Sequence, residues 1–237
     1  MQLTVLMPLY NEESTAGEII TGVLNLDIDL QLIIINNAST DRSPEIISKF
    51  ADRRNVEIIT MNRNIGKGDA IIAGLKKAAG KYTVIQDGDL EYDPKDIVTM
   101  LDLAERKQVL AVFGSRILNP ESGISYNRYL WGGKLLTHIA NILYGAGITD
   151  ESTCYKMVRT DILRQLHLES RRFEFCPELV AKLSRNKIKI HEIPISYHPR
   201  KFEEGKKIRA RDGLEAIWTL IKYRFKPLAD FAVKNKN

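Results

Sequence analysis

Four short apolar runs alternate with helix-spaced apolar positions in the first third of the chain. The runs have the length and β-branched content of buried strands, and they cover residues 3–7, 30–35, 56–60 and 82–85. Between them, apolar residues recur at helical spacing over 16–24, 46–50 and 70–78. Strands separated by single helices favour right-handed crossovers and a mainly parallel sheet. The polar segments that follow the strands would then share the carboxyl edge, where open α/β sheets bind ligands.

The pattern becomes less regular further along the chain. A helix at 97–104 and a strand at 109–113 continue the alternation, and the segment 114–116 ends it. The remaining predicted elements are helices at 125–144, 177–183 and 208–223 and strands at 154–158 and 188–193. Gly132 and Gly133 could bend the first of these helices. The last one places four apolar residues on one face, namely Leu214, Ile217, Trp218 and Ile221.

Composition narrows the class of protein. A chain of 237 residues with 44% hydrophobic content can bury one full core. Its net charge of +5 permits anionic partners without choosing among them. Cys154 and Cys176 lie far apart, so they indicate neither a disulfide framework nor a zinc site. The sequence shows neither a leader pattern nor an apolar run of membrane-spanning length, so we expect a cytoplasmic protein.

The segment 86–94 carries the most informative chemistry. Asp87 and Asp89 leave the predicted strand at 82–85 with a single Gly between them. A sharp bend can bring both carboxylates to one point, and paired hard oxygen ligands suit Mg²⁺ or Mn²⁺. The pattern therefore favours a metal site for a phosphate-bearing ligand. The alternative, taken alone, is an Asp-Gly turn with solvated acids.

A set of short motifs in a fixed order carries a family resemblance. In the first half these are Pro8-x-Tyr10-Asn11-Glu12, Asn36-Asn37-x-Ser39-x-Asp41, Asn64-x-Gly66-Lys67-Gly68, Gln86-Asp87-x-Asp89-Leu90-Glu91 and Phe113-Gly114-Ser115-Arg116. In the second half they are Thr153-Cys154-Tyr155-Lys156, Phe173-Glu174-Phe175-x-Pro177-Glu178 and the segment from Pro194 to Lys207. Together they resemble a family 2 glycosyltransferase, and more narrowly the dolichol-phosphate (polyprenyl-phosphate) mannosyl- and glucosyltransferase group.

This resemblance implies a fold and a division of the chain. The expected fold is GT-A, an α/β fold with a Rossmann-like, mainly parallel central sheet flanked by helices, a C-terminal acceptor-side segment and a terminal amphipathic helix. One domain would cover 1–225, with a nucleotide-sugar half at 1–118 and an acceptor half at 119–225. Residues 226–237 would form a basic tail.

The resemblance also implies a nucleotide-sugar site. Pro8, Tyr10 and Glu12 would line the nucleotide pocket, although Glu12 could instead be an acid at a helix N-terminus. The family commonly has two aspartates where this chain has Asn36 and Asn37. Asn37 would therefore contact the base with an amide, which leaves the choice of nucleotide open. Lys67 would bind phosphate at a helix start, or be an ordinary surface lysine.

The acidic segment would hold a divalent cation, Mg²⁺ or Mn²⁺. By resemblance, Asp87 and Asp89 bind the ion that bridges the two phosphates of the sugar nucleotide, and both count as catalytic. Related mannosyltransferases often carry Gln at the position of Glu91. Glu91 could therefore add a third carboxylate to the metal, or it could cap the next helix.

The acceptor decides whether a general base is needed. A polyprenyl phosphate is already ionised, because its second pKa is about 6, and needs cations rather than a base. The resemblance gives that task to basic side chains, namely Arg116, Arg128, Arg200, Lys206 and Lys207. Of these, Arg116 and Arg200 are predicted to be catalytic, and each could instead be a solvated charge. Were a base required, Glu178 and Asp150 would be the acids to test.

The predicted activity is metal-dependent, inverting transfer of a hexose from GDP-mannose, ahead of UDP-glucose, to a polyprenyl phosphate. The last helix and the basic tail could lie at a membrane surface on its cytoplasmic face, or the helix could simply pack on the core. One alternative is a related enzyme acting on a hydroxyl of a cell-envelope glycan. Another is a non-catalytic module that binds a nucleotide sugar or nucleic acid. Interleaved basic and aromatic residues are missing from the amino-terminal half, so we expect no nucleic-acid partner.

Overall fold

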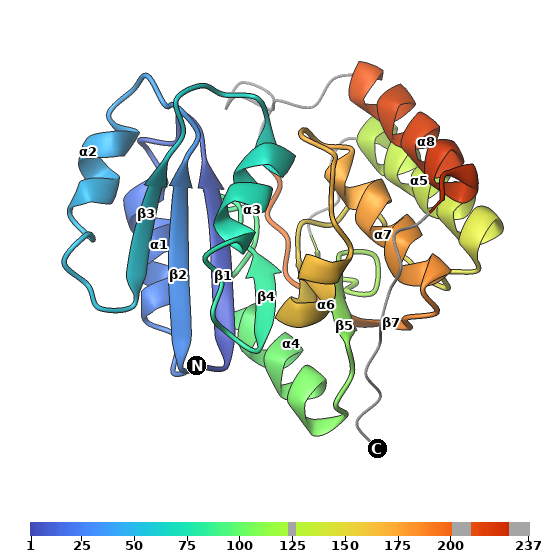
Figure 1. Cartoon of the computed structure of the whole chain (residues 1–237), viewed down its shortest axis with the longest axis horizontal. Helices are drawn as coiled ribbons and strands as arrows, with labels where there is room; N and C mark the ends of the chain where they lie inside the picture. The colour runs from blue at the N-terminus through green and yellow to red at the C-terminus, as the bar shows by residue number, and fades with distance from the viewer. Residues whose placement is uncertain (123–126, 201–209, 228–237) are drawn as a thin grey trace.

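One twisted sheet organises the molecule. The computed structural model describes residues 1–122, 127–200 and 210–227, with the backbone alone at 127–130 and 210. Within these residues, seven strands form a sheet in the order β3-β2-β1-β4-β6-β5-β7. Helices cover both faces of its first half, and α5, α7 and α8 gather at its other end (Figure 1). This is the mixed α/β architecture with a mostly parallel sheet that the sequence predicts.

The first half follows the predicted alternation closely. Its elements are β1 (Leu3–Leu9), α1 (Ala16–Leu24), β2 (Leu30–Asn36), α2 (Ser43–Ser48), β3 (Val56–Thr60), α3 (Lys67–Leu75), β4 (Tyr82–Ile85), α4 (Lys95–Arg106) and β5 (Ala111–Ser115). β1 runs through Pro8, where the sequence predicts an end. On one side Pro8 pairs with Ile35 of β2. On the other side the pairing of β1 with β4 stops at Leu6, so the missing N–H of Pro8 breaks no hydrogen bond to β4.

The second half adds strands to the same sheet. Its elements are α5 (Asn127–Tyr144), β6 (Lys156–Arg159), α6 (Thr160–Gln165), α7 (Phe175–Arg185), β7 (Ile190–Pro194) and α8 (Ala210–Phe225). β6 lies antiparallel between β4 and β5, and β7 lies parallel to β5. The C-terminal part of the chain is therefore built into the sheet and is more than an appended segment.

Several boundaries in the second half differ from the sequence expectation. The strand expected from Cys154 begins at Lys156, because the Cys154 amide donates to the hydroxyl of Tyr92 at 3.1 Å and joins no strand. The strand expected from Ile188 begins at Ile190, because the Ile188 amide closes α7 by donating to the Leu183 carbonyl. The six-residue α6 is not predicted at all. Gly132 and Gly133 lie within the continuous α5.

The parallel register brings four strand ends to the same edge of the sheet, with β4 ending three residues earlier than β1. Leu9 of β1 is opposite Asn36 of β2, and Asn36 is opposite Thr60 of β3. The backbone N–H of Gln86, directly after β4, donates to the Leu6 carbonyl of β1. The loops at 10–15, 37–42, 61–66 and 86–94 therefore leave the sheet at the same edge. Among the helices that the structure describes, none is both long and apolar enough to cross a bilayer.

Candidate active site

Two loops at the carboxyl edge are joined to each other. The amide of Asn11 donates to the hydroxyl of Ser39 at 3.1 Å, and the amide of Thr40 donates to the Asn11 side chain at 2.8 Å. The amide of Glu12 donates to Ser43 Oγ at 2.9 Å. These contacts hold the buried Glu12 and the half-buried Tyr10 next to the end of β2.

The two asparagines after β2 have different roles. Asn36 accepts the backbone N–H of Ser39 at 3.0 Å and so closes its own turn. Asn37 points to the loop after β3, where its amide group donates to Asn64 Oδ1 at 2.9 Å and to the Gly66 carbonyl at 3.3 Å. Its carbonyl oxygen is buried and has no hydrogen-bond partner among the described residues. Asn37 thus offers an unused acceptor at this edge.

Gly88 sets the shape of the acidic turn. A Cβ at this position would come within 1.9 Å of Leu9 Cδ2, so a larger residue would have to displace that side chain where the turn packs against the end of β1. Its carbonyl accepts a hydrogen bond from Thr15 Oγ1 at 2.8 Å. The flanking Asp87 and Asp89 are thereby held above β1 and β4, next to Glu12.

Each aspartate faces its own cation. Lys67, the first residue of α3, forms an ion pair with Asp87 and also donates to Cys154 Sγ at 3.1 Å. Burial opposes the charge of both partners, but their attraction prevails, so the pKa of Lys67 is raised and that of Asp87 is lowered. The pair is therefore ionised.

Arg200 joins two acids from different loops. Its guanidinium donates to Asp89 and, at 3.0 and 3.3 Å, to the two carboxylate oxygens of Glu12. Burial, together with the neighbouring Asp87, raises the pKa of Asp89 to about 6 although Arg200 opposes the shift. Sequence positions 12, 89 and 200 thus meet at one point.

Glu91 holds the segment that delivers Arg200. One of its carboxylate oxygens accepts the hydroxyl of Tyr197 at 3.1 Å, and the other accepts the amide of Arg200 at 2.9 Å. Its carbonyl accepts the amide of His198 at 2.8 Å. Of the two roles that the sequence leaves open, metal ligand or helix cap, the structure displays neither, and a role as metal ligand stays a prediction.

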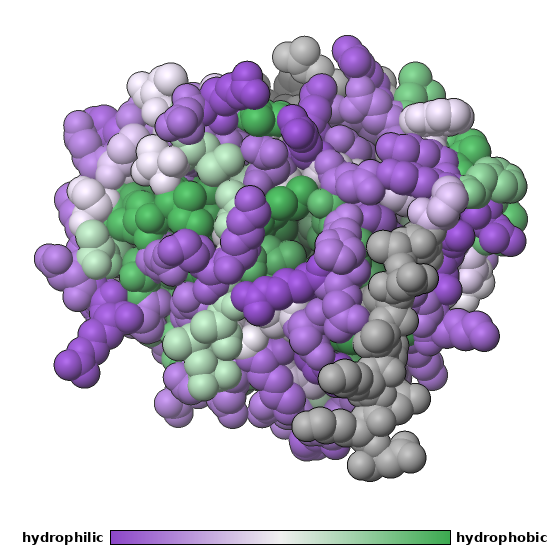
Figure 2. Space-filling view, in the orientation of Figure 1, coloured by the Kyte–Doolittle hydropathy of each residue, from purple (hydrophilic) through white to green (hydrophobic). Residues whose placement is uncertain are grey.

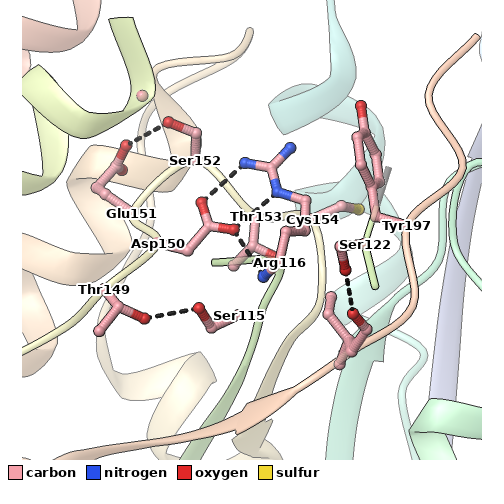
Figure 3. A network of polar contacts seen from close by, with 12 residues as sticks. Ser115, Arg116, Ser122, Thr149, Asp150, Glu151, Ser152, Thr153, Cys154 and Tyr197 are labelled. Carbon is pink, nitrogen blue, oxygen red and sulfur yellow. Dashed lines mark hydrogen bonds and ion pairs between the residues drawn. The ribbon is translucent and has the colours of Figure 1, made fainter. Parts of the chain in front are cut away.

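Arg116 lies beside Tyr197 in a polar network (Figure 3). Its guanidinium makes a bidentate pair with Asp150 at 2.7 and 2.8 Å and lies 5.0 Å from the centre of the Tyr197 ring. Burial opposes the charge of Asp150, but Arg116 outweighs it and lowers the pKa of that carboxyl. In this arrangement Arg116 is a support for Tyr197, and its binding of phosphate stays a prediction.

The two candidate bases are both engaged elsewhere. Asp150 is buried and pairs with Arg116 through both oxygens. Glu178 is fully buried in α7, pairs with Lys182 at 2.6 Å and accepts the amides of Glu169 and Ser170. Neither is available to take a proton from an acceptor hydroxyl, so the structure does not support either as a base.

Some predicted residues cannot be placed in full. Lys206 and Lys207 lie outside the described residues, and of Arg128 only the helical backbone is described. Pro8 is part of β1, next to the loop that carries Tyr10. Sequence reasoning did not identify Cys154 and Tyr197 as neighbours of the acids. The sequence indicates them only through the motifs of the second half in which they stand.

Comparison with known proteins identifies a family. The model "Glycosyl transferase family 2" matches residues 4–166. The chain is 28% identical over 207 residues to the low-salt glycan biosynthesis hexosyltransferase Agl6 of Haloferax volcanii, covering 85% of this chain and 49% of that protein. It therefore spans about half of that relative's length.

A second relative is matched along nearly its whole length. The UDP-N-acetylglucosamine–dolichyl-phosphate N-acetylglucosaminyltransferase of Methanococcus voltae is 25% identical over 245 residues, covering 95% of this chain and 97% of that protein. Among solved structures, glucosyl-3-phosphoglycerate synthase from Mycobacterium tuberculosis, in complex with Mn²⁺, UDP-glucose and phosphoglyceric acid, superposes with a TM-score of 0.72. The two share 16% identity over 95% of this chain and 80% of that one, which establishes a common fold.

Proposed function

Because this chain belongs to glycosyl transferase family 2, we propose that it transfers a hexose from a nucleotide diphosphate sugar to a polyprenyl phosphate at a membrane surface. The observation that carries the proposal is the meeting of Glu12, Asp89 and Arg200 at the carboxyl edge of the sheet. Acids and cationic side chains at one point suit a ligand that brings both a metal ion and phosphates.

Asn37 supports the nucleotide part of the proposal. Its buried Oδ1 lacks a partner among the described residues, and a buried acceptor of this kind is satisfied by a ligand N–H. The ring N–H of a nucleobase has the right chemistry. We assign the ring of Tyr10 and the backbone at Pro8 to the walls of the same pocket, and Glu12 to the ribose or the base.

A divalent cation, Mg²⁺ or Mn²⁺, fits the acidic turn by its chemistry. Asp87 and Asp89 are two hard oxygen donors that already attract positive charge, from Lys67 and Arg200. The described residues contain no cluster of three His, Cys, Asp or Glu side chains able to hold a metal, so substrate phosphates would supply further ligands. When bound, the ion supplies charge that stabilises the departing diphosphate.

The basic side chains then have defined tasks in the reaction. Lys67 stands at the start of α3 beside Asp87, where it can bind a donor phosphate. Arg200 can leave Asp89 and Glu12 and pair with phosphate oxygens bidentately. Attack on the anomeric carbon from the side opposite the leaving diphosphate would invert that centre.

The acceptor is inferred from the state of the two candidate bases. Within the described residues, Asp150 and Glu178 are committed to internal contacts. A phosphate nucleophile needs no base, because it is ionised at neutral pH. The name of the Methanococcus relative also states a dolichyl phosphate. Free thiols at Cys154 and Cys176 are consistent with a reducing compartment, so we assign the reaction to the cytoplasmic face.

The choice of sugar determines which donors the test must contain. The sequence favours GDP-mannose ahead of UDP-glucose, and this order stays a prediction. The relative and the fold neighbour whose names state a nucleotide both state UDP. The test therefore has to include UDP sugars as donors.

The proposal is tested by transfer of radiolabel from GDP-mannose, UDP-glucose and UDP-N-acetylglucosamine into an organic-extractable product. Reactions contain Mn²⁺, Mg²⁺ or EDTA, with and without polyprenyl phosphate. We expect transfer that needs both metal and lipid phosphate and falls by a factor of about 10² or more in Asp89→Asn. Asp93→Asn is the matched control, because Asp93 lies in the same loop and only caps the amide of Lys95.

Other outcomes reject defined parts of the proposal. Label that enters only water-soluble acceptors would mean a hydroxyl acceptor, such as a cell-envelope glycan. Binding of a nucleotide sugar without any transfer would mean a non-catalytic module. Equal activity with and without metal would show that Asp87 and Asp89 do not act by binding a cation.

A further inference from the structure

Helices α5 and α8 each carry an apolar row that no described residue covers. On α8 the row is Leu214, Trp218, Ile221 and Phe225, exposed by 70, 64, 39 and 79%. On α5 it is Trp131, Leu135 and Ile142, exposed by 69, 52 and 68%, with the exposed His138 between them. Both rows follow the same i, i+4, i+7, i+11 spacing, which places each on one side of its helix. We call the two rows together the α5–α8 face.

The exposure does not come from loosely attached helices. The opposite side of α8 is buried through Ala216, Leu220 and Tyr223. The hydroxyl of Tyr144, at the end of α5, donates to the Leu220 carbonyl of α8. α8 also packs along α7. Each helix therefore has one apolar side that holds it to the core and a second that faces outward.

Positive charge accompanies this face. The two helices contain five Lys or Arg residues and two acids, and α5 has no acid. Both acids are paired: Asp212 with Arg172 at 3.5 Å and Glu215 with Arg211 at 2.9 Å. Lys134, Lys222 and Arg224 are exposed. An apolar row flanked by exposed cations is complementary to an anionic lipid surface.

Both helices are attached to loops of the candidate site. At the start of α8, Asp212 pairs with Arg172, whose Cα lies 2.9 Å from where a Gly66 Cβ would be. In α5, Thr137 Oγ1 accepts the amide of Glu151, next to Asp150. Figure 1 places the two helices beside the carboxyl edge of the sheet, and Figure 2 shows apolar residues along that side of the molecule.

We propose that the α5–α8 face docks into the interfacial layer of an anionic lipid bilayer, with Trp131 and Trp218 as its anchors. Tryptophan prefers the layer between the hydrocarbon and the water, and both tryptophans of the chain lie on this face. The inference rests on the proposed function, because docking here would present the acidic site to a lipid-borne phosphate. It names the surface that makes the contact.

The position of the tryptophans permits a direct test. Since the chain has only two, its intrinsic tryptophan fluorescence reports on this face alone. The full chain is titrated with phosphatidylcholine vesicles, with and without phosphatidylglycerol. We expect a blue shift with the anionic vesicles and quenching by bromine-labelled lipid chains. Unchanged emission with anionic vesicles would overturn the proposal.

Variants locate the contact by vesicle flotation. Leu214→Ser combined with Ile142→Ser keeps both tryptophans and should weaken binding to anionic vesicles about tenfold or more. Val98→Ser, at an exposed apolar position of α4, is the matched control and should bind like the parent. Lys222→Glu with Arg224→Glu should weaken binding, whereas Lys107→Glu at the end of α4 should not. Equal binding by all variants would overturn the proposal, provided that their melting temperatures match that of the parent.

Two further measurements separate docking on lipid from self-association and from the transfer reaction. A stable dimer in solution that Leu214→Ser with Ile142→Ser dissociates would assign the face to a second copy and overturn the proposal. Transfer to polyprenyl phosphate in detergent is measured in parallel. Transfer activity in detergent without binding to vesicles would reject the docking and leave the proposed function standing. Binding to vesicles without transfer to any lipid phosphate would reject the proposed function and support the docking.

Discussion

At the scale of single residues, the candidate site is a set of acids whose charge depends on the cation beside each. Asp87 has Lys67, and Glu12 and Asp89 share Arg200. Arg200 lies in the segment after β7 and contacts acids in the loops after β1 and β4, which are far from it in the sequence. The proposed function assigns Arg200 a change of partners, from these acids to phosphate, when a ligand binds.

Arg200→Ala should lower kcat/KM for lipid-phosphate-dependent transfer by a factor of about 10² to 10³, because a phosphate-binding donor is lost. Arg159→Ala is the control, since Arg159 pairs with Asp161 at the other end of β6, away from the site. Steady-state transfer assays on both variants give the comparison. Similar rates for the two would show that Arg200 serves only to neutralise Glu12 and Asp89.

Glu151 leads to a prediction about pH. It is buried, one of its carboxylate oxygens has no partner among the described residues, and burial raises its pKa against the attraction of Lys156. When folding raises the pKa of an acid, the ionised acid destabilises the fold at pH values above the pKa of the folded chain. This destabilisation disappears at pH values below the pKa of the unfolded chain, where the acid is protonated in both states. Glu151→Gln should therefore raise the melting temperature at about pH 8 and leave it unchanged at about pH 4.

Thermal unfolding of both proteins across this range is the measurement. Ser152→Ala is a suitable control, because it removes only a long 3.4 Å contact to the same carboxyl. A Glu151→Gln variant that melts below the parent at neutral pH would show that the ionised carboxylate supports the fold.

At the scale of elements, the start of α3 is fixed by a loop from the second half. A Cβ on Gly68 would lie 2.3 Å from the carbonyl oxygen of Ser170, and the Asp69 amide donates to the Arg171 carbonyl at 2.8 Å. This loop is in turn held by Glu178 of α7, which accepts the amides of Glu169 and Ser170. The position of Lys67, the first residue of α3, thus depends on α7.

Glu178→Ala should lower the free energy of unfolding by about 3 to 5 kcal/mol, because the buried Lys182 loses its carboxylate and two amides lose their acceptor. Glu178→Gln keeps an acceptor and should cost less. Urea unfolding measures both. If Glu178 were instead a base, the variants would keep their stability, lose activity and lose the acidic limb of the pH–rate profile.

At the scale of the whole molecule, the two halves of the chain form one sheet. β5 ends the predicted nucleotide half, yet its neighbours in the sheet are β6 and β7, both from the second half. β6 also pairs with β4. The division at residue 118 therefore does not separate two packing units, although a functional division there stays a prediction.

A fragment of residues 1–118 should consequently fail to form a stable fold. It would leave both edges of β5 unpaired, and also the edge of β4 that pairs with β6. Circular dichroism with thermal melting, compared with residues 1–227, is the measurement. A cooperative transition in the shorter fragment would show that the first half folds alone.

The sequence by itself determined the strand-and-helix alternation of the first half, the family and the position of the acidic segment 86–94 after β4. These are local features: buried strands show as apolar runs, and short motifs such as 86–94 keep their chemistry wherever they stand. Even the boundaries of β3 and β4 were predicted correctly, because both are short apolar runs between polar turns. The naming of Asp150 and Glu178 as the acids to test, were a base required, could not foresee their burial or their ion pairs with Arg116 and Lys182.

Only the tertiary structure decided which charges meet. Arg200 contacts Glu12 and Asp89, and Glu91 accepts the amide of Arg200, although these residues lie more than a hundred positions from Arg200 in the sequence. β6 runs antiparallel to its neighbours, which local periodicity does not show. The sequence places Leu214, Trp218 and Ile221 on one face of the last helix, but it does not show that this side is exposed, because both sides of α5 and α8 carry apolar residues. Periodicity shows that a helix has apolar sides, but packing alone decides which of them stays exposed.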